Sequence, residues 1–224
     1  MNTGKLIVID GTDGSGKATQ TELLRKKLVQ EGRKVKKIDF PRYESNVFGK
    51  LLFECLKENK HGDFLSLDPK IASTLYAVDR FESSEEIRQW LKDSYIVITD
   101  RYVSANQIHQ GGKIYDEKVR GEFLAWLERV EFGVFKIPKP DVIVYLHVPI
   151  EVSLELIKKR AIETSTSADQ AESNAKHLLE SQQSAIKIVE HTNDWIKIDC
   201  AKDGIMRLPE EISNEIIAKI NSYL

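Results

Sequence analysis

The sequence predicts an α/β fold of three layers, α/β/α, in which helices cover both faces of a five-stranded parallel sheet. Two observations lead to this prediction. Five short runs of β-branched and other apolar residues are typical of buried strands; they are residues 5–10, 35–40, 95–100, 141–148 and 195–200. The longer segments between these runs carry apolar residues at helical spacing, and strands that alternate with helices form parallel sheets.

A glycine-rich loop follows the first predicted strand. The loop reads GTDGSGK, and we expect a helix to begin near Ala18. Strand, loop and helix in this order form a phosphate-binding loop, or P-loop, whose backbone N–H groups and lysine neutralise phosphates. We therefore predict a nucleotide site. Its residues are Gly11, Thr12, Asp13, Gly14, Ser15, Gly16, Lys17, Ala18 and Thr19.

The residue after the P-loop lysine departs from the usual pattern. A serine or threonine normally holds Mg²⁺ at this position, but the chain has Ala18 there. Thr19 lies about 100° further around the helix, so it does not take over the same geometry. Two explanations stay open: either carboxylates hold the metal, with Asp13, Asp100 and Glu172 available, or the loop is impaired.

Arginines follow the second and third predicted strands. FPRY occupies residues 40–43, DRY occupies residues 100–102, and YAVDR occupies residues 76–80 between these two strands. An arginine fork can grip phosphate at two points, and an aromatic face can stack on a base. Parallel strands place their ligands at their carboxyl ends. We therefore predict a second anion-binding pocket beside the nucleotide site.

Residues 162–174, between the fourth and fifth predicted strands, break the alternation of strands and helices. The segment reads IETSTSADQAESN and has no apolar periodicity, which is typical of a mobile surface excursion. No segment of the chain has the composition of a linker between domains. We therefore predict a single domain over residues 1–224.

Composition excludes several classes of function. The chain has 33 Lys and Arg against 35 Asp and Glu, a net charge of −2, so nothing favours broad binding to nucleic acid or to a membrane surface. No apolar run approaches the roughly 20 residues of a membrane span, and no signal peptide is visible. The two cysteines lack metal-ligand spacing and suit a reducing compartment. We expect a cytoplasmic protein.

Five segments in series resemble the thymidylate kinase family, over almost the whole chain. They are DGTDGSGKATQ, FPRY, LYAVDR, DRYVSANQIHQGG and IPKPDVIVYL. A lone FP or DRY would be a weak signal, but five at compatible spacing are specific. The resemblance implies a P-loop NTPase fold with a lid at about residues 160–175. It also implies an enzyme that transfers the γ-phosphoryl group of ATP to dTMP, a step of dTTP biosynthesis. The resemblance further implies that this enzyme uses Mg²⁺ and is a homodimer.

The resemblance also implies roles at the reacting phosphates. Lys17 would hold the ATP phosphates, and Asp13 would orient the acceptor phosphate or its metal and water. Arg42 would bridge the donor and acceptor phosphates. Arg101 matches the arginine that grips the acceptor phosphate, and Asp100 is the acid beside it.

At the nucleoside, Tyr76 stands where the family stacks an aromatic on thymine, and Arg80 where it contacts the base edge. Asn106 matches the amide that reads the base, with Gln110 nearby. His109 replaces the aromatic usually found beside the deoxyribose, and we assign it no acid or base role. Phe40 and Pro41 complete the predicted substrate contacts.

In the lid, only Arg160 is placed to close over ATP, and Glu172 is either the lid acid or an exposed helix-start carboxylate. Two other functions stay open. One is a kinase of another nucleoside monophosphate, or of a nucleoside, because a P-loop does not define the acceptor. The other is a nucleotide-binding protein with weakened catalysis, suggested by Ala18 and the arginine-poor lid.

Overall fold

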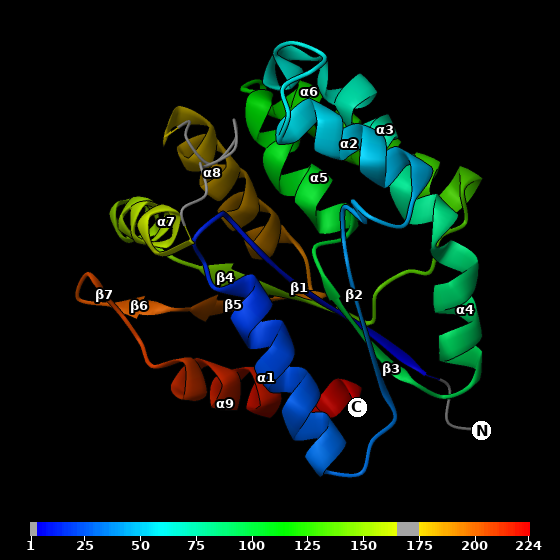
Figure 1. The fold of residues 1–224 in the computed structure, drawn as a ribbon, viewed down its shortest axis with the longest axis vertical. Helices are drawn as coiled ribbons and strands as arrows, with labels where there is room; N and C mark the ends of the chain where they lie inside the picture. Colours follow the sequence, from blue (N-terminus) through cyan, green and yellow to red (C-terminus); the bar gives the residue numbers. More distant parts are fainter. Residues whose placement is uncertain (1–3, 165–174) are drawn as a thin grey trace.

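The computed structural model describes residues 4–164 and 175–224 and contains the predicted three-layer fold (Figure 1). Five parallel strands form one sheet in the order β2-β3-β1-β4-β5. They are β1 (Lys5–Gly11), β2 (Val35–Asp39), β3 (Ile96–Asp100), β4 (Val142–His147) and β5 (Trp195–Asp199). Each begins and ends within one residue of a predicted strand, so the predicted sheet is confirmed.

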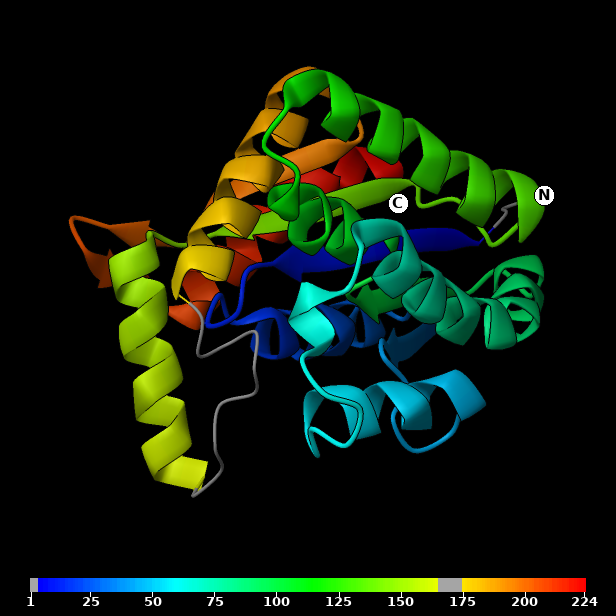
Figure 2. The ribbon, with the colours of Figure 1, turned by 90° about the horizontal axis from the view of Figure 1, so that it is seen from above.

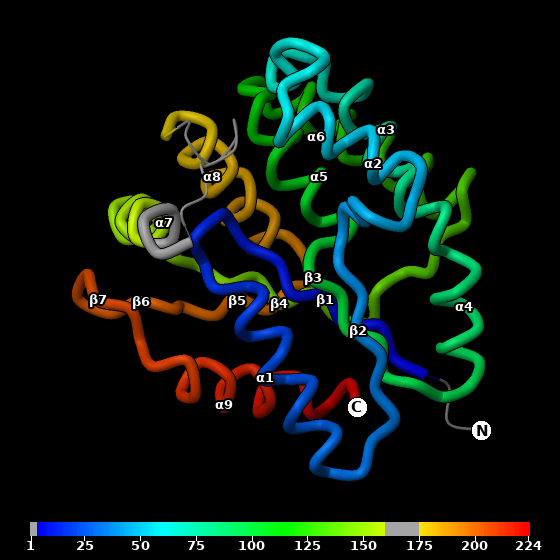
Figure 3. The backbone as a smooth tube through the Cα atoms, in the orientation of Figure 1, coloured from blue at the N-terminus to red at the C-terminus, as the bar shows by residue number. Residues whose placement is uncertain are grey.

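β1 runs through the middle of the sheet, between β3 and β4 (Figure 3). Leu6 and Val8 pack into the core on one face, and Ile7 and Ile9 pack into the core on the other. All four side chains are fully buried. A central parallel strand is covered on both faces, which explains why this run is apolar at successive positions and does not alternate with polar residues.

The helices form two layers around the sheet (Figure 1). Side chains of α1 and α9 complete the core on one face, and side chains of α4, α5, α6 and α8 complete it on the other. The helices are α1 (Lys17–Gln30), α2 (Val47–Leu56), α3 (Pro69–Glu82), α4 (Ser84–Lys92), α5 (Val103–His109), α6 (Glu117–Glu128), α7 (Ile150–Thr164), α8 (Ala175–His191) and α9 (Pro209–Ile220). The helix expected near Ala18 thus begins one residue earlier.

α2 and α3 pack against each other around a small core of their own. Its members are Leu52, Cys55, Leu56, Phe64 and Ala72. α3 begins at Pro69, a residue that suits the first helical position. The Asp68 carboxylate caps this end by accepting from the Lys70 backbone N–H at 2.9 Å. The cap fixes the start of the helix that carries Tyr76 and Arg80.

Shorter elements connect these layers. They are η1 (Phe64–Ser66), η2 (Gly111–Lys113), the π-helix η3 (Arg129–Val134), η4 (Asn221–Tyr223) and the antiparallel pair β6 (Ala201–Lys202) and β7 (Ile205–Met206). The β6–β7 hairpin and α7 stand at one side of the molecule (Figure 2). Most of the predicted lid, residues 165–174, lies outside the described residues. In the described parts of the chain, no helix has the length and apolar content of a membrane span.

Candidate active site

The P-loop connects the end of β1 to the start of α1. Gly14 and Gly16 have φ values of 80° and 84°, a left-handed conformation that costs glycine little. A Cβ on Gly14 would lie 2.7 Å from the carbonyl oxygen of Ser153 in α7, so the loop is packed too closely for a side chain there. No described side chain caps α1 at Gly16. The first N–H groups of this helix therefore point toward a place where an anion can bind.

Lys17 and two hydroxyl groups complete the P-loop. Lys17 Nζ donates to the carbonyl oxygens of Gly11 at 3.0 Å and Thr12 at 2.9 Å. Thr12 Oγ1 and Ser15 Oγ are buried, and neither has a hydrogen-bond partner among the described residues. Buried hydroxyls normally have partners. A lysine beside two such hydroxyls, at an uncapped helix start, fits a bound phosphate chain.

The structure supplies few protein ligands for a metal ion. Ala18 and Thr19 are exposed at the start of α1. Among the side chains that the structure describes, residues 4–159 and 175–224, there is no group of three or more His, Cys, Asp or Glu that could hold a metal. Mg²⁺ that binds together with nucleotide phosphates needs only one or two protein carboxylates. The residues present therefore fit a magnesium ion held mainly by substrate phosphates.

A chain of polar contacts leads from the P-loop into a neighbouring cavity. Arg101 donates through Nη2 to Asp13 Oδ1, and its Nη1 lies 3.0 Å from His109 Nε2. A guanidinium only donates, so His109 Nε2 accepts, and the ring proton lies on Nδ1, 3.1 Å from Ser181 Oγ. His177 stacks on His109, with ring centroids 5.5 Å apart. The contacts fix the tautomer of His109.

These contacts also determine the charge of each group. Burial alone would raise the pKa of Asp13, but Arg101 and Lys17 outweigh it and hold this pKa far below its ordinary value. Burial, followed by the charge of Arg101, lowers the pKa of His109 well below its ordinary value. Arg101 itself has a φ of 66°, a strained conformation for a residue with a side chain. The result is a fixed ion pair beside a neutral imidazole.

Two more carboxylates lie at the same edge of the sheet. Asp10 is fully buried, and its Oδ2 accepts from Ser104 Oγ at 2.5 Å. Asp100 ends β3 directly before Arg101. Burial raises the pKa of both carboxyl groups, while the charges of Lys17 and Arg101 oppose this effect. Asp100 therefore lies close enough to the P-loop lysine to respond to its charge.

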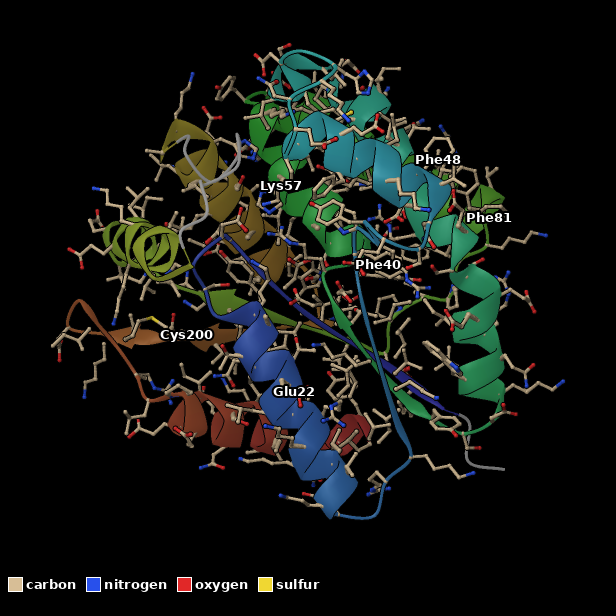
Figure 4. All side chains as sticks on the ribbon, in the orientation of Figure 1. Glu22, Phe40, Phe48, Lys57, Phe81 and Cys200 are labelled. Carbon is tan, nitrogen blue, oxygen red and sulfur yellow. The ribbon has the colours of Figure 1, made fainter. Side chains whose placement is uncertain are left out.

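A cavity that is open to solvent lies beside the P-loop, and the empty space in it and at its mouth is about 660 Å³. Its lining residues are Asp13, Phe40, Pro41, Tyr43, Leu56, Leu65, Tyr76, Arg80, Arg101, Ala105, Asn106, His109, Gln110 and His177. Nine of these fourteen are predicted site residues. Phe40 directly follows the end of β2, where Figure 4 labels it. Tyr76 is held edge-on by Phe64, with ring centroids 5.9 Å apart. The structure thus brings eight of the ten predicted substrate contacts together in one cavity, which Arg42 and Asp100 do not line.

Arg80 and Asn106 share a buried partner that the sequence analysis missed. Glu131, in η3, accepts from Arg80 Nε at 2.7 Å and from Arg80 Nη2 at 2.6 Å. Asn106 Nδ2 donates to Glu131 Oε1 at 3.2 Å and to the Ser73 carbonyl oxygen at 3.1 Å. The side chains of Arg80 and Glu131 are 2% and 0% exposed. The two predicted base-reading side chains are therefore fixed by one carboxylate.

Arg42 does not line the cavity. Its Nη1 donates to Ser83 Oγ at 3.1 Å and to the Glu86 carboxylate at 2.9 Å. Its backbone N–H donates to Asp79 Oδ2 at 3.1 Å. The predicted bridge between donor and acceptor phosphates would require this side chain to leave Ser83 and Glu86.

The remaining predicted residues have different positions. Gln110 Oε1 is buried without a partner among the described residues. Arg160 lies in α7, but its side chain is not described, and Glu172 lies outside the described residues. No motif in the sequence predicted a role for His177 and Ser181, which contact His109. These two residues are four apart on α8 and so share one face of the helix, a spacing that would have paired them.

The fold and the site define a class of protein. A P-loop at the end of β1 and a separate cavity, linked by the Asp13–Arg101 ion pair, are typical of kinases that bind a nucleotide donor and a small acceptor at one sheet edge. The family model described as thymidylate kinase matches residues 9–212. The chain belongs to the thymidylate kinase family, and this family uses ATP.

Similar proteins agree with this membership. Thymidylate kinase from Mycobacterium tuberculosis (strain ATCC 25618 / H37Rv) is 36% identical over 156 residues, which cover 70% of this chain and 72% of that protein. Thymidylate kinase from Plasmodium falciparum is 27% identical over 223 residues, 97% of this chain and 90% of that protein. The solved structure of thymidylate kinase from Candida albicans has a TM-score of 0.75 at 24% identity. The match covers 99% of this chain and 92% of the Candida albicans chain, and the two structures share the same fold.

Proposed function

We propose that this protein transfers the γ-phosphoryl group of ATP to dTMP, giving dTDP and ADP. The observation that carries the proposal is the cavity beside the P-loop. Arg101 reaches from this cavity to Asp13 of the loop, and Arg80 and Asn106 line the same cavity. A phosphate on Arg101 and a base at Arg80 and Asn106 would place a monophosphate nucleotide with its phosphate nearest the donor.

The cavity offers a suitable surface for each part of the acceptor. Arg101 can grip the phosphate, because a guanidinium presents paired donors to phosphate oxygens. Tyr76, held by Phe64, presents a ring on which a base can stack. His109 would stand beside the sugar, as the family resemblance implies. We assign it no acid or base role, because its Nε2 already accepts from Arg101 and burial, followed by the charge of Arg101, lowers its pKa and opposes its protonation.

On the donor side, Lys17 and the uncapped start of α1 would hold the ATP phosphates. The attacking phosphate oxygen is already anionic, so transfer depends on positioning and charge neutralisation more than on a strong base. Bound Mg²⁺ would neutralise the phosphates. We propose Asp100 as the carboxylate that meets this ion, because Asp13 is already paired with Arg101. Arg42 would join the phosphates after rotating away from Glu86.

A coupled assay of ADP release tests the proposal across a panel of acceptors. The panel contains dTMP, dUMP, dCMP, dAMP, dGMP and thymidine, each at saturating ATP and Mg²⁺. We expect dTMP to have the highest kcat/KM. A preference for dCMP, a purine nucleotide or thymidine would favour the rival kinases. A protein that binds ATP in calorimetry but phosphorylates none of the panel would be a nucleotide-binding protein with weakened catalysis.

We also infer that the chain forms a homodimer in the cytoplasm, as the family resemblance implies. Val47 and Phe53 of α2 and Ile71 of α3 are 74%, 39% and 57% exposed. Exposed apolar side chains on adjacent helices favour a contact surface. Both cysteines are free and buried, which suits a reducing compartment. Light scattering should give twice the mass of one chain, and the mass of a single chain would overturn the dimer.

A further inference from the structure

Glu131 does not line the cavity, yet it contacts two residues that do. Its fully buried carboxylate uses both oxygens: Oε2 accepts from Arg80 Nε, and Oε1 accepts from Arg80 Nη2 and Asn106 Nδ2. An ionised carboxylate only accepts hydrogen bonds. Arg80 and Asn106 must therefore each turn a donor toward this carboxylate. This limits which hydrogen-bonding groups they can present to the cavity.

Asn106 has one possible amide orientation under this constraint. Its Nδ2 lies 3.1 Å from the Ser73 carbonyl oxygen and 3.2 Å from Glu131 Oε1. Both partners are acceptors, and an amide nitrogen has two hydrogens, so the partners assign the nitrogen and use both hydrogens. Asn106 is 2% exposed and lines the cavity. The group that it has left for a ligand is its oxygen, an acceptor.

Arg80 presents the opposite character. A guanidinium carries five N–H donors. Two of them go to Glu131, and a third goes from Nη1 to the Tyr102 carbonyl oxygen at 3.2 Å. The remaining two are donors, and Arg80 also lines the cavity. The same cavity therefore offers an acceptor from Asn106 and donors from Arg80.

This pair of groups matches some pyrimidines and not others. Thymine and uracil carry an N–H next to a carbonyl oxygen, which complements an acceptor and a donor. Cytosine carries an unprotonated ring nitrogen next to an amino group, the reverse pattern. An unpaired polar group in a buried site discriminates strongly between such substrates.

We propose that Glu131 is a specificity-determining positioning residue: by holding the Asn106 amide with its nitrogen toward the protein, it makes the cavity accept thymine and reject cytosine. This inference rests on the proposed function and deepens it. Glu131 acts through Arg80 and Asn106 and does not itself touch the substrate.

Glu131→Gln tests this role. The new amide keeps one acceptor oxygen and places a donor at the other position, where it faces either Arg80 Nε or, with the amide turned, Arg80 Nη2 and Asn106 Nδ2. Asn106 then loses the anionic acceptor that holds its amide nitrogen, so the amide can turn and present its nitrogen to the cavity, at the cost of its bond to the Ser73 carbonyl oxygen. Measured kcat/KM for dTMP and for dUMP should then fall together, about 10- to 100-fold. The ratio of kcat/KM for dTMP to kcat/KM for dCMP should fall at least about tenfold. The corresponding ratio for dTMP and dUMP should stay constant.

The matched control is Glu128→Gln, the same change at an exposed residue three positions earlier. It should leave both ratios unchanged. If Glu131 is merely structural, Glu131→Gln lowers kcat/KM for all three nucleotides equally, and an unchanged ratio of dTMP to dCMP would overturn the proposal. A wild-type protein that does not phosphorylate dTMP would instead overturn the proposed function.

Glu131→Gln leaves the Arg80 charge buried without the Glu131 counter-charge, which destabilises the fold, so a second measurement that does not depend on this variant is needed. The wild-type protein then decides the question by NMR. The side-chain NH₂ signal of Asn106, assigned by its absence in Asn106→Ser, should exchange slowly with solvent in the unliganded protein, because both hydrogens are bonded. Rapid exchange of this signal would place the nitrogen in the open cavity and overturn the proposal.

Discussion

Among single residues, Lys17 has the clearest expected effect. Lys17→Ala should lower kcat by about 10²- to 10³-fold, because a preorganised charge at the transferring phosphate is lost. The melting temperature should change little, because Lys17 is the first residue of α1 and its side chain belongs to none of the three hydrophobic cores. Steady-state kinetics and thermal unfolding measure the two effects. The control is Lys26→Ala, at an exposed position of α1. A folded Lys17→Ala protein with near-normal turnover would contradict the P-loop assignment.

A titration of Mg²⁺ separates the roles of the two aspartates. Asp100→Asn should raise the Mg²⁺ concentration needed for half-maximal rate, because it removes a hard oxygen ligand. Asp13→Asn should lower the rate at every Mg²⁺ concentration, because Asp13 mainly orients Arg101. Ala18→Ser should shift the midpoint only modestly.

Asp93→Asn is the matched control for this titration, because Asp93 is exposed and follows α4, away from Asp100. An unshifted midpoint in Asp100→Asn would end the assignment of Asp100 to the metal.

The types and order of the residues predicted which side chains line the cavity better than they predicted where each side chain points. Tyr76, Arg80 and Asn106 were placed by their motifs. The direction of Arg42 toward Glu86 depends on a rotamer that no motif encodes. Glu131 was missed because it lies 51 residues from Arg80, and a glutamate in a mixed polar segment usually indicates a solvated surface.

At the scale of elements, the start of α3 controls the helix that carries Tyr76 and Arg80. Asp68→Ala should cost about 1 kcal/mol, because the Lys70 N–H loses its capping acceptor. In a chain of this size, the melting temperature should fall by about 2–4 °C. The kcat/KM for dTMP should stay within about twofold, because packing against α2 still holds the helix. Calorimetry and kinetics check this, with the exposed Asp93→Ala as control.

A loss of activity in Asp68→Ala that exceeds its loss of stability would show that the cap also positions the cavity. The sequence predicted the long elements well, because the inner strands β1, β3 and β4 are buried and apolar at most of their positions. It did not predict the β6–β7 hairpin or the π-helix η3. Two-residue strands and a single π turn are too short to leave a period in the sequence.

For the whole molecule, His109 should make stability fall in mild acid. Its pKa in the folded protein lies well below the ordinary value, because of burial and then Arg101. Below about pH 6.5 the His109 imidazole binds a proton in the unfolded chain but stays unprotonated in the folded protein. This residue should therefore remove up to about 1.4 kcal/mol of stability per pH unit as the pH falls.

Urea unfolding at pH 7, 6 and 5 measures this effect. His109→Gln should lose less stability between pH 7 and pH 5 than the wild type, and His61→Gln, at an exposed position, should follow the wild type. Equal slopes for the wild type and His109→Gln would show that His109 does not stay neutral in the folded protein.

The central position of β1 also affects synthesis on the ribosome. Lys5 of β1 pairs with Ile96 of β3, and Ile7 pairs with Val142 of β4. The strand that leads into the P-loop is made first, but both of its neighbours are made much later. Non-local pairing of this kind is slow and leaves apolar segments exposed meanwhile. A nascent chain therefore gains its nucleotide site only after about two thirds of it has been translated, and until then β1 is a segment that chaperones would protect.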